Sequence, residues 1–449
     1  MPMRTMIEPG TNALDLSYVR SQFPSLSQTV NGHPAAFLDG PGGTQVPQRV
    51  IDAISAYLRN DNANTGGAYA TSRKTDAMIA RARGAMADFL HCDADEVAFG
   101  PNMTTLTFAI SRSLGRGIEG RELKPGDEIV VTRLDHDANV SPWLAMAEDR
   151  GATVRWAEIH DKDCTLDMAD LASKINQNTK LVAVGYASNA VGTINPVKEI
   201  VRLAHAAGAL CYLDAVHYGP HGLIDVAALD CDFLVCSTYK FFGPHMGVLY
   251  GKREHLKHLR PYKVRPNTNA IPNCWEWGTL NHECIAGIEA CVEYIADLGR
   301  RILPENQEPS STRGSLGGNS ETQQSTRRAA IEAAYAAIHQ HEHAIIEKMM
   351  SGLNAIPGLK IYGITDPARF NDRCATFAVR IEGHTPLELA TKLGERGFFT
   401  WDGNYYALNL TEHLDVEKSG GFLRIGFVHY NTMDEVDRLL ATLQEIVRR

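Results

Sequence analysis

The chain has 449 residues, of which 44% are hydrophobic and 22% charged, a composition typical of a soluble enzyme with two or three domains. Its formal net charge is −9 and it has no basic run or patch, which excludes nucleic acid as an expected partner. No apolar run approaches the roughly 20 residues that span a bilayer, and the start lacks a secretory signal. Nine cysteines without CxxC pairs indicate reduced thiols rather than disulfides or a zinc site. We therefore expect a cytoplasmic protein that binds no membrane.

Short β-branched runs alternate with longer helical patterns between residues 35 and 295. This alternation predicts an α/β fold in which helices wrap a mostly parallel sheet. The runs expected to form buried strands are EVAF (96–99), EIVVT (128–132), KLVAVGY (180–186), ALCYL (209–213) and DFLVC (232–236).

The C-terminal third has a different pattern. Residues 304–326 are rich in Ser, Gly, Gln and Glu, which predicts a mobile loop or linker. A long amphipathic helix over 327–353, the strands LKIYGI and ATFAVRIEG and a last helix predict a smaller α+β domain. The expected parts are an N-terminal segment 1–34 packing with the small domain, a large domain 35–300, a linker 301–326 and the small domain 327–449.

Polar side chains follow each of the five expected strands. In open parallel sheets, ligands bind outside the carboxyl ends of the strands. Taken singly, each residue has an ordinary interpretation as a helix cap or a turn residue. In chain order, the residues are Thr104 and Thr105, then His136, then Asn189, then Asp214 and His217, and finally Ser237, Tyr239 and Lys240.

Lys240 ends the apolar run FLVC and stands directly before two phenylalanines. An unpaired buried ammonium costs several kcal/mol, so this lysine must reach water, find a partner or be held covalently. The joint pattern supplies what pyridoxal phosphate requires: a lysine for the Schiff base, an acid for the pyridine nitrogen, a flat ring to stack on it, and donors at a helix N-terminus for the phosphate.

The run LDAVHYGPHGLIDVAALDCDFLVCSTYKFFGPHMGVLYG resembles the cofactor-lysine region of class V aminotransferases, specifically cysteine desulfurases and their relatives. The resemblance implies fold type I architecture, pyridoxal 5'-phosphate as cofactor, an amino-acid substrate and a homodimer with shared active sites. Further segments match in the same order: FLDGPGGTQVP, LDHDANVSPW, SNAVGTINPVKEI, WEWGTLN and LRIGFVHYNTMDEVD.

The resemblance also implies roles for single residues. Lys240 would form the Schiff base, Asp214 would bind the pyridine nitrogen and His136 would stack on the ring. His217 would lie near the phenolic oxygen. The expected phosphate contacts are Thr104, Ser237, Tyr239 and, from the other subunit, Thr279.

The substrate side is assigned in the same way. Arg424 in LRIGF would grip the substrate carboxylate, a role suited to its bidentate fork. Asn189 would contact both cofactor and substrate, and Tyr406 would lie beside the substrate. Tyr69 is a candidate proton donor near the dimer interface. Loops 62–72, 262–273 and 399–410 are expected to shape this pocket.

Two positions depart from the family pattern. Tyr239 stands where cysteine desulfurases usually carry a histidine. The family's persulfide cysteine aligns with Tyr406 in DGNYYAL, and no cysteine follows Cys374. Persulfide formation needs a thiolate in that loop, so the sequence predicts a branch that lacks the persulfide cysteine.

Three functions remain open at this point. The first is a carbon-sulfur lyase that removes the α-proton and then a β-substituent, ending as pyruvate and ammonia. The second is an aminotransferase or an epimerase, which breaks the same α-bond. The third is a cofactor-binding scaffold without turnover. Such a scaffold would not need the lysine, the acid and the arginine together.

No metal site is expected. His339 and His343 are one helical turn apart, but the sequence offers them no third ligand. His217 and His221 have the same spacing but straddle a Gly-Pro turn, which breaks helical geometry.

Overall fold

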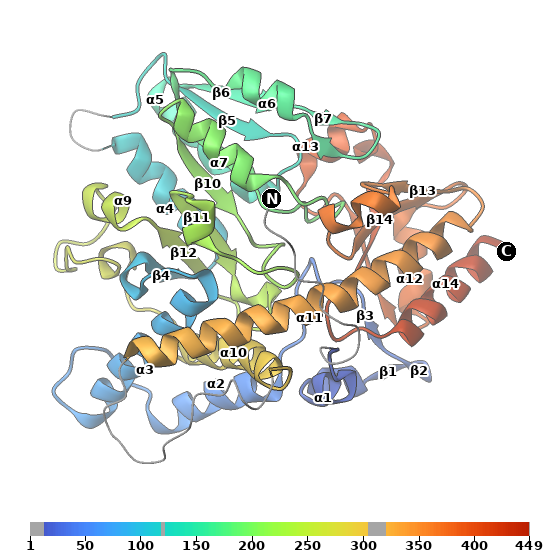
Figure 1. Cartoon of the computed structure of the whole chain (residues 1–449), viewed down its shortest axis with the longest axis horizontal. Helices are drawn as coiled ribbons and strands as arrows, with labels where there is room; N and C mark the ends of the chain where they lie inside the picture. Colours follow the sequence, from blue (N-terminus) through green and yellow to red (C-terminus); the bar gives the residue numbers. More distant parts are fainter. Residues whose placement is uncertain (1–12, 118–121, 304–319, 449) are drawn as a thin grey trace.

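A seven-stranded sheet forms the centre of the computed structural model, which describes residues 13–117, 122–303 and 320–448 (Figure 1). The strand order is β4-β12-β11-β10-β9-β5-β6, and every pairing is parallel except the two made by β12. The predicted α/β fold with a mostly parallel sheet is therefore confirmed. The bounds are β4 Val97–Gly100, β5 Glu128–Thr132, β6 Thr153–Ala157, β9 Thr179–Gly185, β10 Leu210–Asp214, β11 Phe233–Ser237 and β12 Gly247–Gly251.

Both faces of this sheet are buried. Along β11, Leu234 and Cys236 pack in one hydrophobic core, whereas Phe233 and Val235 pack in another. Alternate side chains of a strand point to opposite faces, so helices must cover both sides, as in other parallel sheets. The helices of this domain are α2 Gln48–Asn60, α3 Ala70–Leu90, α4 Met103–Arg116, α5 Ser141–Arg150, α6 Met168–Lys174, α7 Val197–Ala206, α8 Val226–Leu229, α9 Arg253–His258 and α10 His282–Arg300.

The C-terminal domain contains an antiparallel four-stranded sheet of order β13-β14-β17-β16. It packs with α11, α12 and α14 around its own hydrophobic core, which confirms the predicted smaller α+β unit (Figure 1). Its elements are α11 Ser320–Asn354, β13 Leu359–Tyr362, β14 Thr376–Ile381, α12 Pro386–Gly394, β15 Phe398–Phe399, β16 Trp401–Gly403, α13 Leu408–His413, β17 Phe422–Gly426 and α14 Met433–Arg448.

The N-terminal segment contacts both domains. Phe23 packs in the large-domain core, while the Arg20 guanidinium donates a hydrogen bond of 3.0 Å to Glu435 of the small domain. Strand β3 pairs in parallel with β15, and Ala36 packs in the small-domain core. The remaining short elements are α1 Leu16–Ser21, β1 Thr29–Val30, β2 His33–Pro34, β3 Ala36–Phe37, β7 Ile159–His160 and β8 Thr165–Leu166.

Helix α11 begins at Ser320, earlier than the predicted start at residue 327. The physical reason is that Glu and Gln, three of the seven residues 320–326, form helices about as well as Leu, so a stretch without apolar residues still continues the helix. The other part of the predicted linker, 304–319, lies outside the described residues.

Helix α11 also runs through both hydrophobic cores. Ile331 and Ile338 pack in the large-domain core, whereas Ile345 and Met349 pack in the small-domain core. The two cores therefore meet within this helix, which connects the domains as a continuous element (Figure 1).

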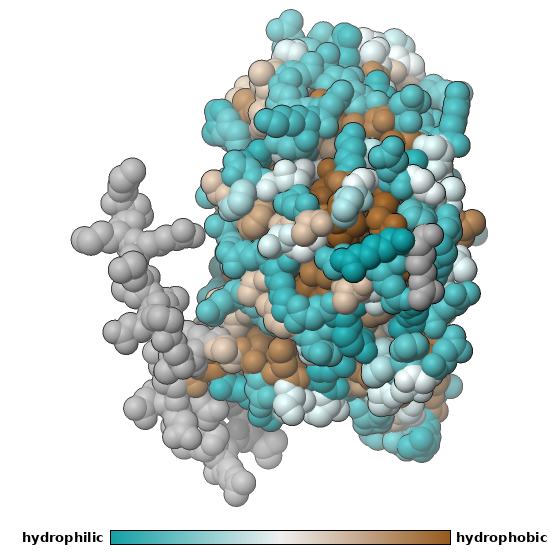
Figure 2. All heavy atoms as spheres, turned by 90° about the vertical axis from the view of Figure 1, so that its right-hand side faces the viewer, coloured by the Kyte–Doolittle hydropathy of each residue, from teal (hydrophilic) through white to brown (hydrophobic). Residues whose placement is uncertain are grey.

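Figure 2 shows the face that carries the small domain, where hydrophilic side chains cover most of the surface around a few hydrophobic patches. Within the described part of the chain, no helix is both long and apolar enough to span a bilayer.

The contact between α10 and α11 requires a glycine. A Cβ at Gly299 would lie 1.7 Å from the carbonyl oxygen of Ala330. We therefore predict that Gly299→Ala pushes the two helices apart and lowers the free energy of unfolding by about 1–3 kcal/mol, as overpacked cores do. Urea denaturation would measure this change.

Gly84 in α3 is the matched control, because a Cβ there meets no atom within 4 Å. Gly84→Ala should leave stability unchanged or raise it by up to about 1 kcal/mol through helix propensity. Equal effects of the two substitutions would contradict this account of the α10–α11 contact.

Candidate active site

Lys240 lies just past the carboxyl end of β11, where a 3₁₀ turn over Thr238–Lys240 follows the strand. Its Nζ donates hydrogen bonds to the backbone oxygens of Pro41 and, at 3.0 Å, of Gly42. A Cβ at Gly42 would lie 2.0 Å from Asp39 Oδ2, so only glycine allows this tight loop. The GPGGT loop therefore holds the lysine by main-chain carbonyls.

Desolvation dominates the acid-base behaviour of Lys240. It lowers the pKa of the ammonium to about 7, helped by the positive charge of Arg424 and opposed by Asp39 and Asp214. A lysine with this pKa is substantially neutral near neutral pH, which is the form that acts as a nucleophile or a base.

Two buried acids lie at the neighbouring strand ends. Burial raises the pKa of Asp214 to about 6, although its Oδ1 accepts a hydrogen bond of 2.9 Å from the Val216 N–H. Burial, and then the charge of Asp214, raise the pKa of Asp135 to about 8. Asp135 is therefore protonated at neutral pH, which leaves the negative charge on Asp214. Sequence reasoning missed Asp135, although it directly precedes His136.

His136 carries a neutral ring. Burial lowers its pKa to about 4, with further contributions from Lys240 and Arg424, and its Nδ1 accepts a hydrogen bond of 3.0 Å from the Ala138 N–H. Tyr406 stacks against this ring, with centroids 5.4 Å apart and planes 23° from parallel. The His136 ring is thus uncharged, and its stacking on a cofactor stays a prediction.

Tyr405 and Tyr406 have φ angles of +56° and +61°, a left-handed conformation that is uncommon for bulky residues and often marks functional loops. The Asp137 N–H donates a hydrogen bond of 2.7 Å to the carbonyl of Tyr406, which ties this loop to the His136 segment. The Tyr406 side chain itself is 72% exposed.

Arg424 reaches the site from β17 of the small domain. Its guanidinium forms an ion pair of 2.7 Å with Asp39 and donates a hydrogen bond of 3.1 Å to the carbonyl of Asn189. The Tyr405 ring lies 4.1 Å from its Cζ. Asp39 was not singled out from the sequence, although it lies within the matching segment FLDGPGG.

Six of the predicted residues line one cavity of about 480 Å³. Residues 401–406 of the expected loop 399–410 form another part of its wall, and none of the nine cysteines lines it. The six residues are His136, Asn189, Tyr239, Lys240, Tyr406 and Arg424.

The end of β11 also meets the start of α4. Ser237 Oγ accepts a hydrogen bond of 3.3 Å from the Met103 N–H, and Thr104 is the next residue of this helix. Tyr239 stacks on His245 with ring centroids 4.7 Å apart. The N-terminus of a helix flanked by hydroxyls is a favourable site for a phosphate.

Tyr69 and Thr279 do not reach the cavity within one chain. Tyr69 is 54% exposed just before α3, and Thr279 is exposed beside Trp277. Loops 62–72 and 262–273 likewise contribute no lining residue. Roles for these residues require a second subunit and stay predictions.

His217 lies beside the cavity rather than in its wall. Its Nε2 is 3.2 Å from Thr376 Oγ1, and its Nδ1 is buried without a partner among the described residues. The Gly-Pro turn brings the ring of His221 to 4.9 Å from that of His217. The turn breaks helical geometry as predicted, yet it brings the two rings together; the expected absence of a metal site stays a prediction.

The donor set fits pyridoxal 5'-phosphate. Lys240 has a neutral form available near neutral pH, and the neighbouring acid Asp214 is ionised there. The buried Oδ1 of Asn189 lacks a hydrogen-bond partner within the described residues. An unpaired buried acceptor facing a cavity is expected where a ligand completes the hydrogen bonding.

Comparisons with known proteins agree with this geometry. The sequence matches the family described as Aminotransferase class-V over residues 36–311 and 328–439. A probable cysteine desulfurase of Synechocystis is 31% identical over 445 residues, covering 96% of this chain and 95% of that protein. A cysteine desulfurase of Pectobacterium atrosepticum is 30% identical over 445 residues, covering 96% of this chain and 97% of that protein.

The fold also matches solved structures. The apo cysteine desulfurase of Thermococcus onnurineus has a TM-score of 0.80 at 24% identity, covering 99% of this chain and all of the other. The cysteine desulfurase CsdA of Escherichia coli has a TM-score of 0.79 at 23% identity, covering 97% of this chain and 99% of that one.

The fold and the lysine site define an enzyme of fold type I that depends on pyridoxal phosphate. Its curated relatives are named cysteine desulfurases. The chain belongs to the class V aminotransferase family. The predicted family, fold type and cofactor are thereby confirmed.

The environment of Lys240 predicts its titration. In the cofactor-free protein, Lys240 should titrate near pH 7, well below the ordinary lysine value of 10.5. Arg424→Gln should raise this pKa, because it removes a repelling charge and leaves Asp39 free to stabilise the ammonium. NMR of the reductively methylated protein would measure both values.

Lys252 provides the comparison in the same spectra. Partial burial acts to lower its pKa, but the hydrogen bond to Asp230 and the charges of Asp232 and Asp230 together raise it. A pKa of Lys240 equal to or above that of Lys252 would show that desolvation does not control the site.

Proposed function

We propose that the enzyme is a carbon-sulfur lyase that eliminates a sulfur group from the β-carbon of a small amino acid. One observation carries this proposal: the cavity combines a lysine of lowered pKa and a carboxylate-binding arginine, yet no cysteine lines it. With cysteine as substrate, one water is consumed and the products are pyruvate, ammonia and hydrogen sulfide.

The cofactor would be held by residues around the lysine. Asp214 would bind the ring nitrogen, and Thr104, Ser237 and Tyr239 the phosphate. His136 would stack on the ring, which its neutral state allows. When bound, pyridoxal phosphate supplies an electron sink for the charge left at the substrate α-carbon. His217 would lie near its phenolic oxygen.

Lys240 and Arg424 would divide the work on the substrate. Lys240 would remove the α-proton, because its amine is substantially neutral at neutral pH. Arg424 would bind the α-carboxylate, and its pair with Asp39 holds the guanidinium in position before substrate arrives. Asn189 would orient the substrate through its unpartnered Oδ1.

The cavity wall supports elimination rather than persulfide chemistry. A persulfide route needs a thiolate beside the substrate, but Tyr406 occupies that loop. Burial raises the pKa of the Cys374 thiol well above its ordinary value, which disfavours the nucleophilic form. The names of the relatives support a sulfur-containing amino acid as substrate.

A homodimer would complete the site. Tyr69 and Thr279 are exposed in one chain, which supports their delivery to the cavity of a second subunit. Tyr69 would then act as proton donor near the leaving group, and Thr279 would contact the phosphate.

A panel of amino acids tests the reaction. We expect pyruvate and sulfide from cysteine or a related sulfur amino acid, without added keto acid and after alkylation of accessible thiols. Alanine with a protein-bound persulfide would overturn elimination. A requirement for a keto acid would indicate an aminotransferase, and loss of optical activity alone would indicate an epimerase. No turnover of any substrate would indicate a scaffold.

Replacing the lysine tests the assignment of the base. Lys240→Ala should abolish both turnover and the yellow absorption of the bound cofactor, since no other lysine lines the cavity. Absorption spectra and pyruvate release would be measured together. A variant that keeps both signals would place the cofactor elsewhere.

Replacing the arginine tests substrate binding. Arg424→Ala should weaken transition-state binding by about 2–5 kcal/mol, because the substrate carboxylate and Asp39 both lose a buried partner. Steady-state kcat/KM would measure the loss. Arg202→Ala, an exposed residue of α7 outside the Lys240 cavity, is the control and should leave kcat/KM nearly unchanged. Similar losses in both variants would refute the role of Arg424.

A further inference from the structure

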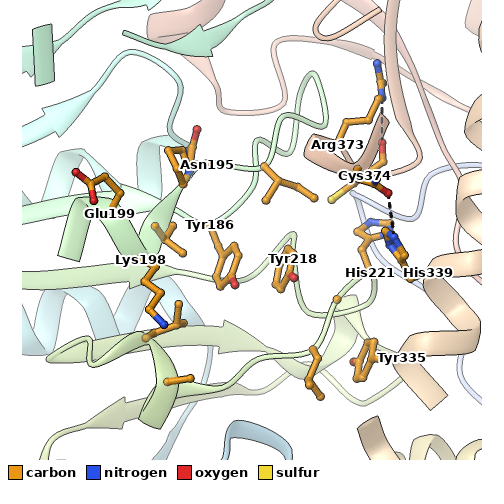
Figure 3. A pocket seen from close by; sticks show the side chains of 18 of the residues that line it. Tyr186, Asn195, Lys198, Glu199, Tyr218, His221, Tyr335, His339, Arg373 and Cys374 are labelled. Carbon is orange, nitrogen blue, oxygen red and sulfur yellow. Dashed lines mark hydrogen bonds between the residues drawn. The ribbon is translucent and has the colours of Figure 1, made fainter. Parts of the chain in front are cut away.

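His217, His221 and Cys374 form a second chemical cluster next to the active site. One ligand atom from each lies within 4.8 Å of the others, and all three side chains are buried. The histidines come from the turn after β10 in the large domain, whereas Cys374 precedes β14 in the small domain. Figure 3 shows Cys374 beside His221 on the wall of a cavity.

The histidines of this cluster have unused nitrogen atoms. His221 Nδ1 pairs with Glu342 Oε2 at 2.8 Å, and its Nε2 has no partner among the described residues. His217 Nδ1 is likewise unpartnered, and its Nε2 makes only the longer contact with Thr376. A buried polar atom without a partner costs free energy, so such atoms point to a missing ligand.

A carboxylate supports one histidine of the cluster. The carboxylate of Glu342 behind His221 is the arrangement that orients a histidine toward a metal and raises its basicity.

We propose that His217, His221 and Cys374 bind a zinc ion. Two imidazoles and a thiolate suit Zn²⁺, and three protein ligands leave a fourth position for water or a small ligand. Ligand atoms around tetrahedral zinc lie about 3.5 Å apart, so small side-chain rotations would close the cluster. Binding replaces the S–H bond of Cys374 by a Zn–S bond and releases one proton to solvent, with no change of oxidation state.

A path to the cluster exists. His221, Glu342 and Cys374 line a cavity of about 1300 Å³, the one drawn in Figure 3. The ion and the fourth ligand can therefore arrive from a side separate from the Lys240 cavity, to which none of these three residues contributes.

The zinc ion would tie the two domains together beside the active site. His217 follows Asp214 by three residues. Strand β14 begins just after Cys374 and pairs with β17, where Ala378 lies opposite Arg424. Fixing Cys374 to the large domain would therefore fix the strand that carries Arg424. This inference does not depend on which reaction the enzyme catalyses.

Metal titration of the full-length holoenzyme tests the site. After treatment with a chelator, calorimetry should show one tightly bound Zn²⁺ per chain. Substitution with Co²⁺ should give a thiolate-to-cobalt charge-transfer band. It should also give tetrahedral d–d bands, and these d–d bands lie at longer wavelength than the cofactor absorption. Absence of binding, or cobalt bands without the charge-transfer band in the wild-type protein, would overturn the proposal.

Variants identify the ligands. Cys374→Ser should remove the charge-transfer band and weaken Zn²⁺ binding by about 100-fold or more, and Glu342→Gln should weaken it by about 10–100-fold. Two control variants should keep the wild-type affinity for Zn²⁺. Cys164→Ser changes a buried thiol outside the cluster, and His339→Gln changes a histidine that lines the same cavity.

Circular dichroism and cofactor absorption would establish that each variant is folded. Unchanged affinity in folded Cys374→Ser, or an equal loss in the control variants, would assign the metal to another site and overturn the proposal.

Discussion

Desolvation of the Lys240 ammonium is the constraint on which the rest of the site depends. The end of β11 places this amine where main-chain carbonyls of Pro41 and Gly42 are its hydrogen-bond partners. The surrounding charges act in opposite directions and each has a smaller effect than desolvation, because Arg424 repels the ammonium while Asp39 and Asp214 attract it. Desolvation therefore decides the protonation state, and it brings the pKa to about 7, where an amine can both bond covalently and move a proton.

The site exists only when the two domains are docked. Asp214 ends β10 and Lys240 lies just past β11 of the large sheet, whereas Arg424 comes from β17 of the small one. The hydrogen bond from Arg424 to the Asn189 carbonyl and the continuous helix α11 join the two units, and α11 contributes to both cores. A displacement between the domains would move the arginine away from the lysine, so the packing of α11 and the chemistry of the cavity are linked.

Under the proposed function, the loop with Tyr405 and Tyr406 accounts for a change of reaction within the family fold. Two consecutive left-handed residues turn the chain so that Tyr406 stacks on His136, and the Tyr405 ring covers the Arg424 guanidinium. The fold holds the lysine and the arginine through strands that this loop does not alter. The chemistry at the substrate β-carbon can therefore change with one loop while the cofactor site stays the same.

The sequence by itself determined five of the seven strands of the large sheet, its mostly parallel character and the lysine just past β11, because buried β-branched runs and strand-end polar residues are local patterns. Only the tertiary structure decided which distant residues meet. Asp39 was found beside Arg424, and Cys374 beside His221, because a loop and a domain interface bring together residues far apart in the chain. It also decided protonation, since the pKa of Asp135 depends on burial and on Asp214, which no spacing in the sequence reveals.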